Sequence, residues 1–167
     1  MTAVERVYLD TNVFIMLSEK DHRLQQLLVR MISSQPSEKP PKFATSELTL
    51  SELLVKPYQV GDDTLINGYE SLILNSEWLD VRPVDRAVLY YAAALRAQYR
   101  HLKLPDAIHV SSAIGQDCSH FLSDDHGIKD RYDLVHRRNG FNRSAPTLTI
   151  LRPDEPSLTS LIESLTA

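Results

Sequence analysis

Acidic residues stand at four places in this 167-residue sequence where a folded chain would bring them together, namely Asp10, Glu52, Asp106 and Asp125. Carboxylates held close together raise one another's pKa, so they stay ionised together only when a cation joins them. Oxygen ligands without thiolates or a histidine cluster favour Mg²⁺ or Mn²⁺ over zinc. The sequence therefore predicts a divalent-metal site, on condition that the fold gathers these acids.

Each acid also has a purely structural interpretation. Asp10 would cap the helix that follows it, and Asp106 would match the dipole at the start of its helix. The adjacent Asp124 and Asp125 would be ordinary turn residues. Glu52 is harder to explain in this way, because an acid in so apolar a segment is expected near the core, where an unpaired carboxylate is costly to bury. The joint arrangement favours a site.

The elements that would position the acids alternate between short strand-like runs and longer helix-like ones. Strands are predicted at residues 4–9, 42–45, 78–81, 120–123 and 147–151. Helices are predicted at residues 13–34 with a break near Asp21, and at 47–55, 62–76, 85–99 and 105–116. Ser46 is expected to cap the second of these helices and Pro57 to stop it.

Strands separated by helices predict an α/β fold, a three-layer α/β/α sandwich around a mostly parallel sheet of four to five strands. In such sheets, ligands bind beyond the carboxyl ends of the strands. Asp10 directly follows the first predicted strand, and Asp125 comes just after the fourth. Asp106 lies in the first turn of a helix that Pro105 opens. The predicted fold thus brings the acids to neighbouring edges.

The composition is that of one domain from a reducing compartment. Hydrophobic residues make up 43% of the chain, which is enough to fill a single core. Cys118 is the single cysteine and cannot form an internal disulfide, and no leader-like segment opens the sequence, so a cytoplasmic location is expected. The apolar runs are shorter than the roughly 18–20 residues that cross a bilayer, which predicts no membrane span. The net charge of −4 excludes a surface coated in positive charge but not a local basic patch.

Four stretches resemble the motifs of PIN-domain ribonucleases, and most closely those of the VapC-type toxins of toxin–antitoxin pairs. They are YLDTNVFI around Asp10, ATSELTLSELL around Glu52, LPDAIHVSSA around Asp106 and FLSDDHGIK around Asp125, in family order and with family-like spacing. The acids of the first three stretches match the three best-defined acids of the family. In the last stretch, Ser123 and Asp125 match a hydroxyl residue and an acid, and Asp124 takes the variable place between them.

The resemblance implies a role for each of these residues. It assigns Asp10, Asp106 and Asp125 as ligands of Mg²⁺ or Mn²⁺, with Glu52 completing the site directly or through water. The residues implied to support the site are Thr11, Asn12, Ser123 and Asp124. His109, one turn after Asp106, is expected to satisfy a hydrogen bond rather than to act as a general base.

The implied activity is metal-dependent hydrolysis of RNA phosphodiester bonds, which leaves 5′-phosphate and 3′-hydroxyl ends. RNA beside an acidic site needs positive charge nearby. The candidate RNA-binding residues are Arg131, Arg137, Arg138 and Arg143. Tyr132 and Phe141 lie among them and could stack on unpaired bases. A solvated charged face explains the same residues equally well, and residues 96–103 form a second basic stretch.

The resemblance further implies a cognate antitoxin protein and a homodimer. Residues 1–152 are expected to form the PIN-like nuclease domain, and residues 153–167 a C-terminal tail with a short helix. The segment 129–144 is longer than the connection expected before the last strand. These two additions could alter substrate choice, dimer contacts or partner binding, but they leave the acids untouched.

Three other functions fit parts of the pattern. The main alternative is a PIN-like module that binds RNA or protein with weak or no catalysis, although the acids are all present. A phosphatase with Asp10 as its nucleophile would need a second acid two residues later, where Asn12 stands. A nuclease for structured DNA would use the same chemistry, but the chain lacks the large insertions that such enzymes generally carry.

Overall fold

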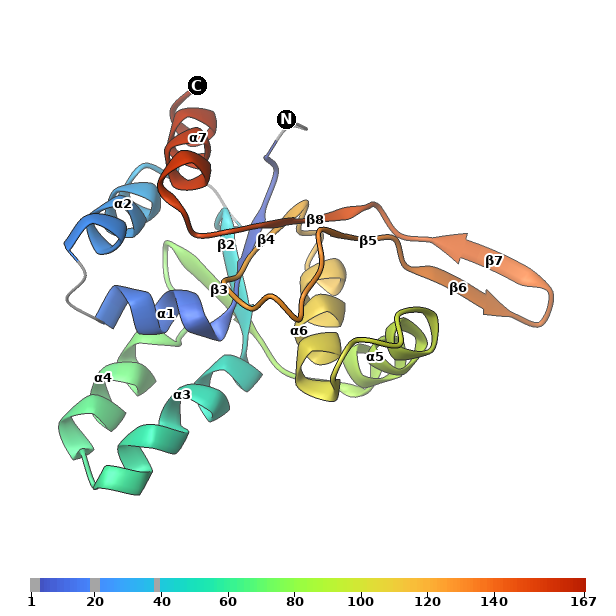
Figure 1. Ribbon diagram of the computed structural model, residues 1–167, viewed down its shortest axis with the longest axis horizontal. Coiled ribbons are helices and arrows are strands. Elements are labelled where there is room, and N and C mark those ends of the chain that lie inside the picture. Colours follow the sequence, from blue (N-terminus) through green and yellow to red (C-terminus); the bar gives the residue numbers. More distant parts are fainter. Residues whose placement is uncertain (1–3, 19–21, 38–39) are drawn as a thin grey trace.

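The central sheet has six strands in the order β3-β2-β1-β4-β8-β5, and helices cover both of its faces (Figure 1). The computed structural model describes residues 4–18, 22–37 and 40–167. The strands are β1 (Val7–Leu9), β2 (Phe43–Ser46), β3 (Leu79–Arg82), β4 (His120–Leu122), β5 (Arg131–Tyr132) and β8 (Leu148–Leu151). Neighbours pair in parallel except β5, which is antiparallel to β8. The predicted mostly parallel α/β sandwich is confirmed, and β5 adds a sixth strand.

The helices flank this sheet in chain order. They are α1 (Thr11–Ser18), α2 (His22–Ser33), α3 (Glu47–Val60), α4 (Asp63–Leu72), α5 (Arg86–Gln98), α6 (Leu104–Gly115) and α7 (Glu155–Thr166). The predicted break near Asp21 lies outside the described residues. Over the described residues, no helix combines the length and the apolar character needed to cross a membrane.

Two hydrophobic cores lie on opposite faces of the sheet, because successive side chains of a strand point to opposite sides. Val7 and Leu9 of β1 belong to the core covered by α1, α2, α3, α4 and α7. Tyr8 belongs to the other core, under α5 and α6, where its ring stacks on Phe121 with centroids 4.9 Å apart. All three β1 side chains are fully buried, so the position of Asp10 at the end of this strand is fixed by packing on both sides.

Helix α3 starts where the sequence predicted but ends later. The Ser46 hydroxyl accepts a hydrogen bond from the Leu48 N–H at 3.3 Å, which confirms the predicted cap. The prediction that Pro57 stops the helix is wrong. The helix runs on to Val60 and ends at Gly61, whose φ of 67° is the left-handed conformation that glycine adopts readily. A proline inside a helix costs about 3 kcal/mol, and the apolar packing of the buried Pro57 ring opposes this cost.

A β-hairpin occupies most of the segment 129–144, which was predicted from the sequence to be a long connection before the last strand. Strands β6 (Val135–Arg138) and β7 (Phe141–Ser144) pair antiparallel and form a sheet of their own. Asn139 and Gly140 join them, with φ values of 52° and 76°. Two successive positive φ angles are those of a type I′ turn, for which Asn-Gly is a preferred pair. The hairpin projects beyond the main sheet on the side of α5 (Figure 1).

Residues 153–167, expected as a tail with a short helix, contain the 12-residue helix α7. Asp154 caps it by accepting a hydrogen bond from the Ser157 N–H at 2.8 Å. The helix packs against α2 and buries Leu158, Leu161 and Ile162 in the same core as β1. The C-terminal segment is therefore part of the packed structure.

Candidate active site

The predicted acids lie near the carboxyl ends of β1 and β4, the two central strands. Asp10 follows β1 directly, and its N–H donates to the Leu122 carbonyl of β4 at 3.1 Å. Asp125 lies in the loop after β4, while Glu52 comes from α3 and Asp106 from the first turn of α6. Parallel strands end at one edge of the sheet, so this edge collects side chains that are distant in sequence.

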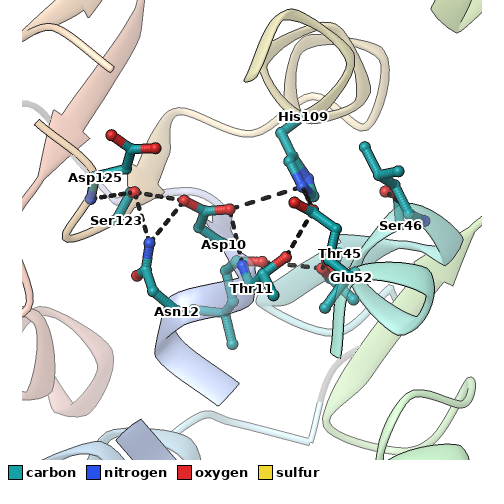
Figure 2. A network of polar contacts seen from close by, with 12 residues as sticks. Asp10, Thr11, Asn12, Thr45, Ser46, Glu52, His109, Ser123 and Asp125 are labelled. Atoms are coloured by element: carbon teal, nitrogen blue, oxygen red, sulfur yellow. Dashed lines mark hydrogen bonds and ion pairs between the residues drawn. The ribbon is translucent and has the colours of Figure 1, made fainter. Parts of the chain in front are cut away.

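The Asp10 carboxylate is almost completely buried, with 5% of the residue exposed, and three donors hold it (Figure 2). Its Oδ1 accepts from the Thr11 N–H at 2.8 Å, and its Oδ2 accepts from the Asn12 side chain at 2.9 Å and from the Ser123 hydroxyl. These donors are neutral, so they orient the carboxylate without cancelling its charge. Three of the residues expected to support the site thus contact Asp10.

The same residues position the loop that carries Asp125. The Asn12 side-chain oxygen accepts from the Asp124 N–H at 3.0 Å, and the Ser123 hydroxyl accepts from the Asp125 N–H at 3.0 Å. Asp125 in turn accepts from the Gly127 N–H at 2.7 Å through its Oδ1. Asp124 is exposed and takes part through its backbone.

Glu52 and His109 form an ion pair at the side of the site (Figure 2). Glu52 Oε1 pairs with His109 Nε2 and accepts from the Thr11 hydroxyl at 2.9 Å. The other ring nitrogen of His109 lies 2.8 Å from the Tyr8 hydroxyl, and Nε2 lies 3.8 Å from Asp10 Oδ1. His109 is 2% exposed, and both of its nitrogens are engaged. It satisfies hydrogen bonds, as the sequence predicted.

Burial opposes the charged form of both partners, but their hydrogen bond and mutual attraction have the larger effect on both pKa values. The pKa of His109 is raised despite burial, because of Glu52 first and then the nearby charges of Asp10 and Asp106. The pKa of Glu52 is lowered despite burial, through the hydrogen bond and charge of His109 and the hydrogen bond from Thr11. Both shifts favour the charged imidazolium–carboxylate pair.

Asp106 lies among other carboxylates, and their effect on its pKa outweighs that of the cations His109 and Lys103. Burial raises its pKa, and the charges of Asp125 and Asp10 raise it further. Asp106 and Asp125 both border Gly127, where an added Cβ would lie 3.0 Å from Asp125 Oδ1 and 3.7 Å from Asp106 Oδ2. The missing side chain at Gly127 leaves the two carboxylates room to face the same space.

This donor set fits a hard divalent cation that keeps part of its water shell. Within residues 4–18, 22–37 and 40–167, no three His, Cys, Asp or Glu side chains converge closely enough to hold a metal ion by themselves. Mg²⁺ does not need such a set, since it usually binds through one or two carboxylates, waters and substrate phosphates. In that same part of the chain, no lysine or arginine forms an ion pair with Asp10, Asp106 or Asp125. The excess negative charge is what such a cation would neutralise.

Arg152 was missed in the sequence; it directly follows β8 and fixes the Asp125 loop. Its guanidinium donates to the carbonyls of Ser123 at 3.0 Å, Asp125 at 2.8 Å and Ile128 at 2.6 Å. Backbone carbonyls leave no trace in a sequence pattern, so no signal pointed to Arg152. Tyr8 was also missed, because an inward-facing strand residue looks like any other core side chain.

In the described part of the chain, none of the predicted RNA-binding arginines forms an ion pair with the acids of the site. Arg131 of β5 forms an ion pair with Asp133 at 2.9 Å, while the other three are on the hairpin, which projects past α5 (Figure 1). The interpretation of Tyr132 as a base-stacking residue is wrong. Its side chain is fully buried in the core because β5 pairs with β8 and turns the ring inward.

Comparisons with known proteins agree with this architecture. The chain resembles a toxin–antitoxin complex from Klebsiella pneumoniae at 22% identity and a TM-score of 0.51, over 71% of this chain and 86% of the other. It resembles VapC20 from Mycobacterium tuberculosis, described as a sarcin–ricin loop cleaving toxin, at 14% identity and a TM-score of 0.56, over 69% and 86%. FitAcB from Neisseria gonorrhoeae matches at 18% identity and a TM-score of 0.55, over 72% and 88%.

These structures share the fold. A comparison with curated proteins returned no match. The family model of the PIN domain matches residues 7–134, which include β1 to β5 and all of the predicted acids. The chain therefore belongs to the PIN domain family.

Proposed function

We propose that this protein is a metal-dependent endoribonuclease, and that it is the toxin of a type II toxin–antitoxin pair. The observation that carries the proposal is that Asp10, Asp106 and Asp125 lie near one edge of the sheet, close enough that burial and the charges of the other two raise the pKa of Asp106. Repulsion among these carboxylates does not stabilise the fold. A divalent cation bound beside them would offset the repulsion.

In this proposal, Asp10, Asp106 and Asp125 hold Mg²⁺ or Mn²⁺. A bound cation of this kind lowers the pKa of a coordinated water and offsets charge that builds on the phosphate. Thr11, Asn12 and Ser123 keep the Asp10 carboxylate oriented. Glu52 faces the site as an ionised carboxylate and completes it directly or through a water.

His109 serves as a positioning residue rather than as a general base. Its nitrogens are occupied by Glu52 and Tyr8, and its raised pKa favours the protonated form. A ring whose two nitrogens are engaged, and whose protonated form is favoured, is poorly placed to take a proton from water. His109 instead keeps Glu52 charged beside the buried Asp10.

The proposed substrate is RNA, bound through Arg131, Arg137, Arg138 and Arg143. The motif resemblance to VapC-type toxins supports a cognate antitoxin and a homodimer, and the single cysteine, Cys118, is in keeping with a cytoplasmic location. The Klebsiella structure is described as a toxin–antitoxin complex, which fits this assignment. The main alternative stays a binding module with weak or absent catalysis.

Calorimetric titration with Mn²⁺ separates the two functions. A nuclease site should bind the ion in the wild-type chain and lose that binding in the Asp10→Asn/Asp106→Asn variant, which keeps the shape of both side chains. Cleavage of total RNA should follow the same pattern and stop in EDTA. A wild-type chain that neither binds Mn²⁺ nor cuts RNA would favour the binding module.

A further inference from the structure

The hairpin and α5 enclose a small concavity, which we call the hairpin pocket. It has a volume of about 210 Å³ and is lined by Tyr91, His136, Arg138, Asn139, Phe141 and Arg143. All of these residues except Tyr91 lie beyond residue 134, where the match to the PIN family model ends. The hairpin pocket is therefore outside the part of the chain that the family model describes.

Strand register places the chemistry of the hairpin on one face. His136 pairs with Arg143, and Arg138 pairs with Phe141. Because alternate residues of a strand face the same side and paired residues share it, these four side chains lie together. One face of the hairpin thus combines two guanidinium groups, an imidazole and a phenyl ring.

Tyr90 and Tyr91 of α5 hold this face in place. The Tyr90 hydroxyl lies 3.3 Å from His136 Nε2 and accepts from Arg138 Nη1 at 3.1 Å. Both tyrosine rings meet the His136 ring edge-on, with centroids 5.6 Å and 5.4 Å away. The hairpin is therefore fixed to the body of the protein by polar and aromatic contacts, while Arg138, Phe141 and Arg143 on the same face stay exposed.

The charge and exposure of the hairpin differ from those of the rest of the chain. Residues 135–146 contain three arginines and no acid, although the whole chain carries a net charge of −4. Phe141 is 75% exposed, the largest value among the exposed large hydrophobic residues described. An exposed phenyl ring gives the fold no burial energy, and its place among arginines matches what unpaired nucleic acid needs: a stacking surface with cations for the phosphates.

We infer that the hairpin pocket binds an unpaired base of the RNA substrate, with Arg138 and Arg143 at the flanking phosphates. This inference rests on the proposed function, because RNA is the ligand. The volume lies below the roughly 300–1,000 Å³ of pockets for drug-sized ligands, so it suits one planar ring. In duplex RNA the base faces are stacked on one another and the hairpin would reach only phosphates.

The hairpin pocket is a binding site and not a reacting one. In the described part of the chain, none of its residues shares a hydrogen bond or an ion pair with Asp10, Asp106 or Asp125, and the hairpin projects away from the ends of β1 and β4 (Figure 1). Its loss should therefore raise KM and leave kcat near the wild-type value. For substrates too short to reach from the acids to the hairpin, loss of the hairpin pocket should leave KM unchanged.

The test measures binding without cleavage, by fluorescence anisotropy in EDTA with a labelled single-stranded oligoribonucleotide and with the same sequence as a duplex. Phe141→Ala should weaken single-strand binding by roughly 5- to 150-fold, the usual loss for one stacked base. Phe141→Trp should retain it. The logarithm of the RNA-binding constant falls linearly with the logarithm of the salt concentration. In Arg143→Ala this slope should be less steep by about 0.7, as expected for one lost single-strand phosphate contact.

Matched controls come from the far side of the molecule. Tyr58→Ala removes an aromatic side chain that is 67% exposed on α3, and Arg30→Ala removes an exposed arginine from α2. Both should bind RNA as the wild type does. Equal losses in the controls, an unchanged affinity in Phe141→Ala, or equal binding of the duplex would overturn the inference and would leave a protein partner as the occupant of the hairpin.

The two proposals fail separately. RNA binding that depends on Phe141, in a protein that never cuts RNA, would uphold the hairpin pocket and reject the nuclease. Metal-dependent cleavage that is indifferent to Phe141 and Arg143 would uphold the nuclease and reject the hairpin pocket.

Discussion

The imidazole of His109 is paired with the carboxylate of Glu52, which lies 57 residues earlier in the chain, and together they border the buried Asp10. The pair links α6 to α3 across the ends of the central strands. Without His109, the unpaired carboxylate of Glu52 would add negative charge to the site. Burial and the neighbouring carboxylates already oppose the ionised form of Asp106 there. The pair thus keeps the acidic site compatible with a stable fold.

The stability that this pair contributes should depend on pH. The pKa of His109 is raised above its usual 6.5, so its contribution is complete below pH 6.5 and is lost as the pH rises through the raised value. The pKa of Glu52 is lowered below its usual 4.5, so its contribution is complete above pH 4.5 and is lost as the pH falls through the lowered value. The pair therefore stabilises most between about pH 4.5 and 6.5.

Thermal unfolding of the wild type and of His109→Gln across this range provides the measurement. The difference in Tm between them should be largest inside the window and should shrink at higher pH. Glu52→Gln should give a difference that is also largest there. A Tm difference that stays constant with pH would show that His109 acts only by filling space.

Asp106→Asn should stabilise the metal-free protein while it abolishes function. The folded-state pKa of Asp106 is raised, so its ionised form opposes folding at neutral pH. Because the side chain is partly exposed, we expect a gain of up to about 1 kcal/mol, or about 2–4 °C in Tm, in EDTA. Added Mn²⁺ should raise the Tm of the wild type more than that of the variant. A lower Tm for the variant in EDTA would contradict this account of Asp106.

Gly127→Ala should impair activity without unfolding the protein. The new Cβ would lie 3.0 Å from Asp125 Oδ1, which is held by the Gly127 N–H, so the carboxylate has to move. We expect reduced cleavage and weaker Mn²⁺ binding with a near wild-type Tm. Gly68→Ala in α4 is the matched control, since its Cβ meets nothing within 4 Å and alanine favours a helix. Full activity in Gly127→Ala would mean that the position of Asp125 is not critical.

Arg152→Ala should both destabilise the chain and disorder the Asp125 loop. The guanidinium satisfies three backbone carbonyls, and hydrogen bonds to a charged donor are worth about 1.5–3 kcal/mol each at most sites. We expect a loss of about 2 kcal/mol or more, and so a Tm lower by at least about 4–8 °C. Arg23→Ala removes an exposed pairing with Glu155, which solvent screens, and should leave the Tm almost unchanged. Similar Tm values for the two variants would show that Arg152 is dispensable.

The parts of the fold that could be predicted are those that bury side chains. Residues 7–9 are wholly apolar and fully buried, so the first strand and the place of Asp10 at its end followed from the pattern. The same holds for the strand before Ser123. Glu52 could be singled out because an acid is unusual in so apolar a helix. Asp106 could be singled out because it follows the proline that opens its helix.

The parts that could not be predicted depend on exposure or on backbone contacts. The hairpin was missed because its strands are largely exposed and lack the apolar alternation of a half-buried strand, although Asn139 and Gly140 gave the turn signal. The core position of Tyr132 follows from a strand of two residues, too short for a periodic pattern. Burial of Pro57 in a longer helix is a tertiary effect that local propensity does not contain.

The measurement that tests the central claim most directly is the chemistry of the RNA ends after cleavage with Mn²⁺. Hydrolysis by an activated water at a site built on Asp10, Asp106 and Asp125 should leave 5′-phosphate and 3′-hydroxyl ends, and both should vanish in EDTA and in Asp10→Asn. Ends carrying a 2′,3′-cyclic phosphate, or cleavage that persists in EDTA and in Asp10→Asn, would mean that the acids are not the site of an RNA-hydrolysing reaction.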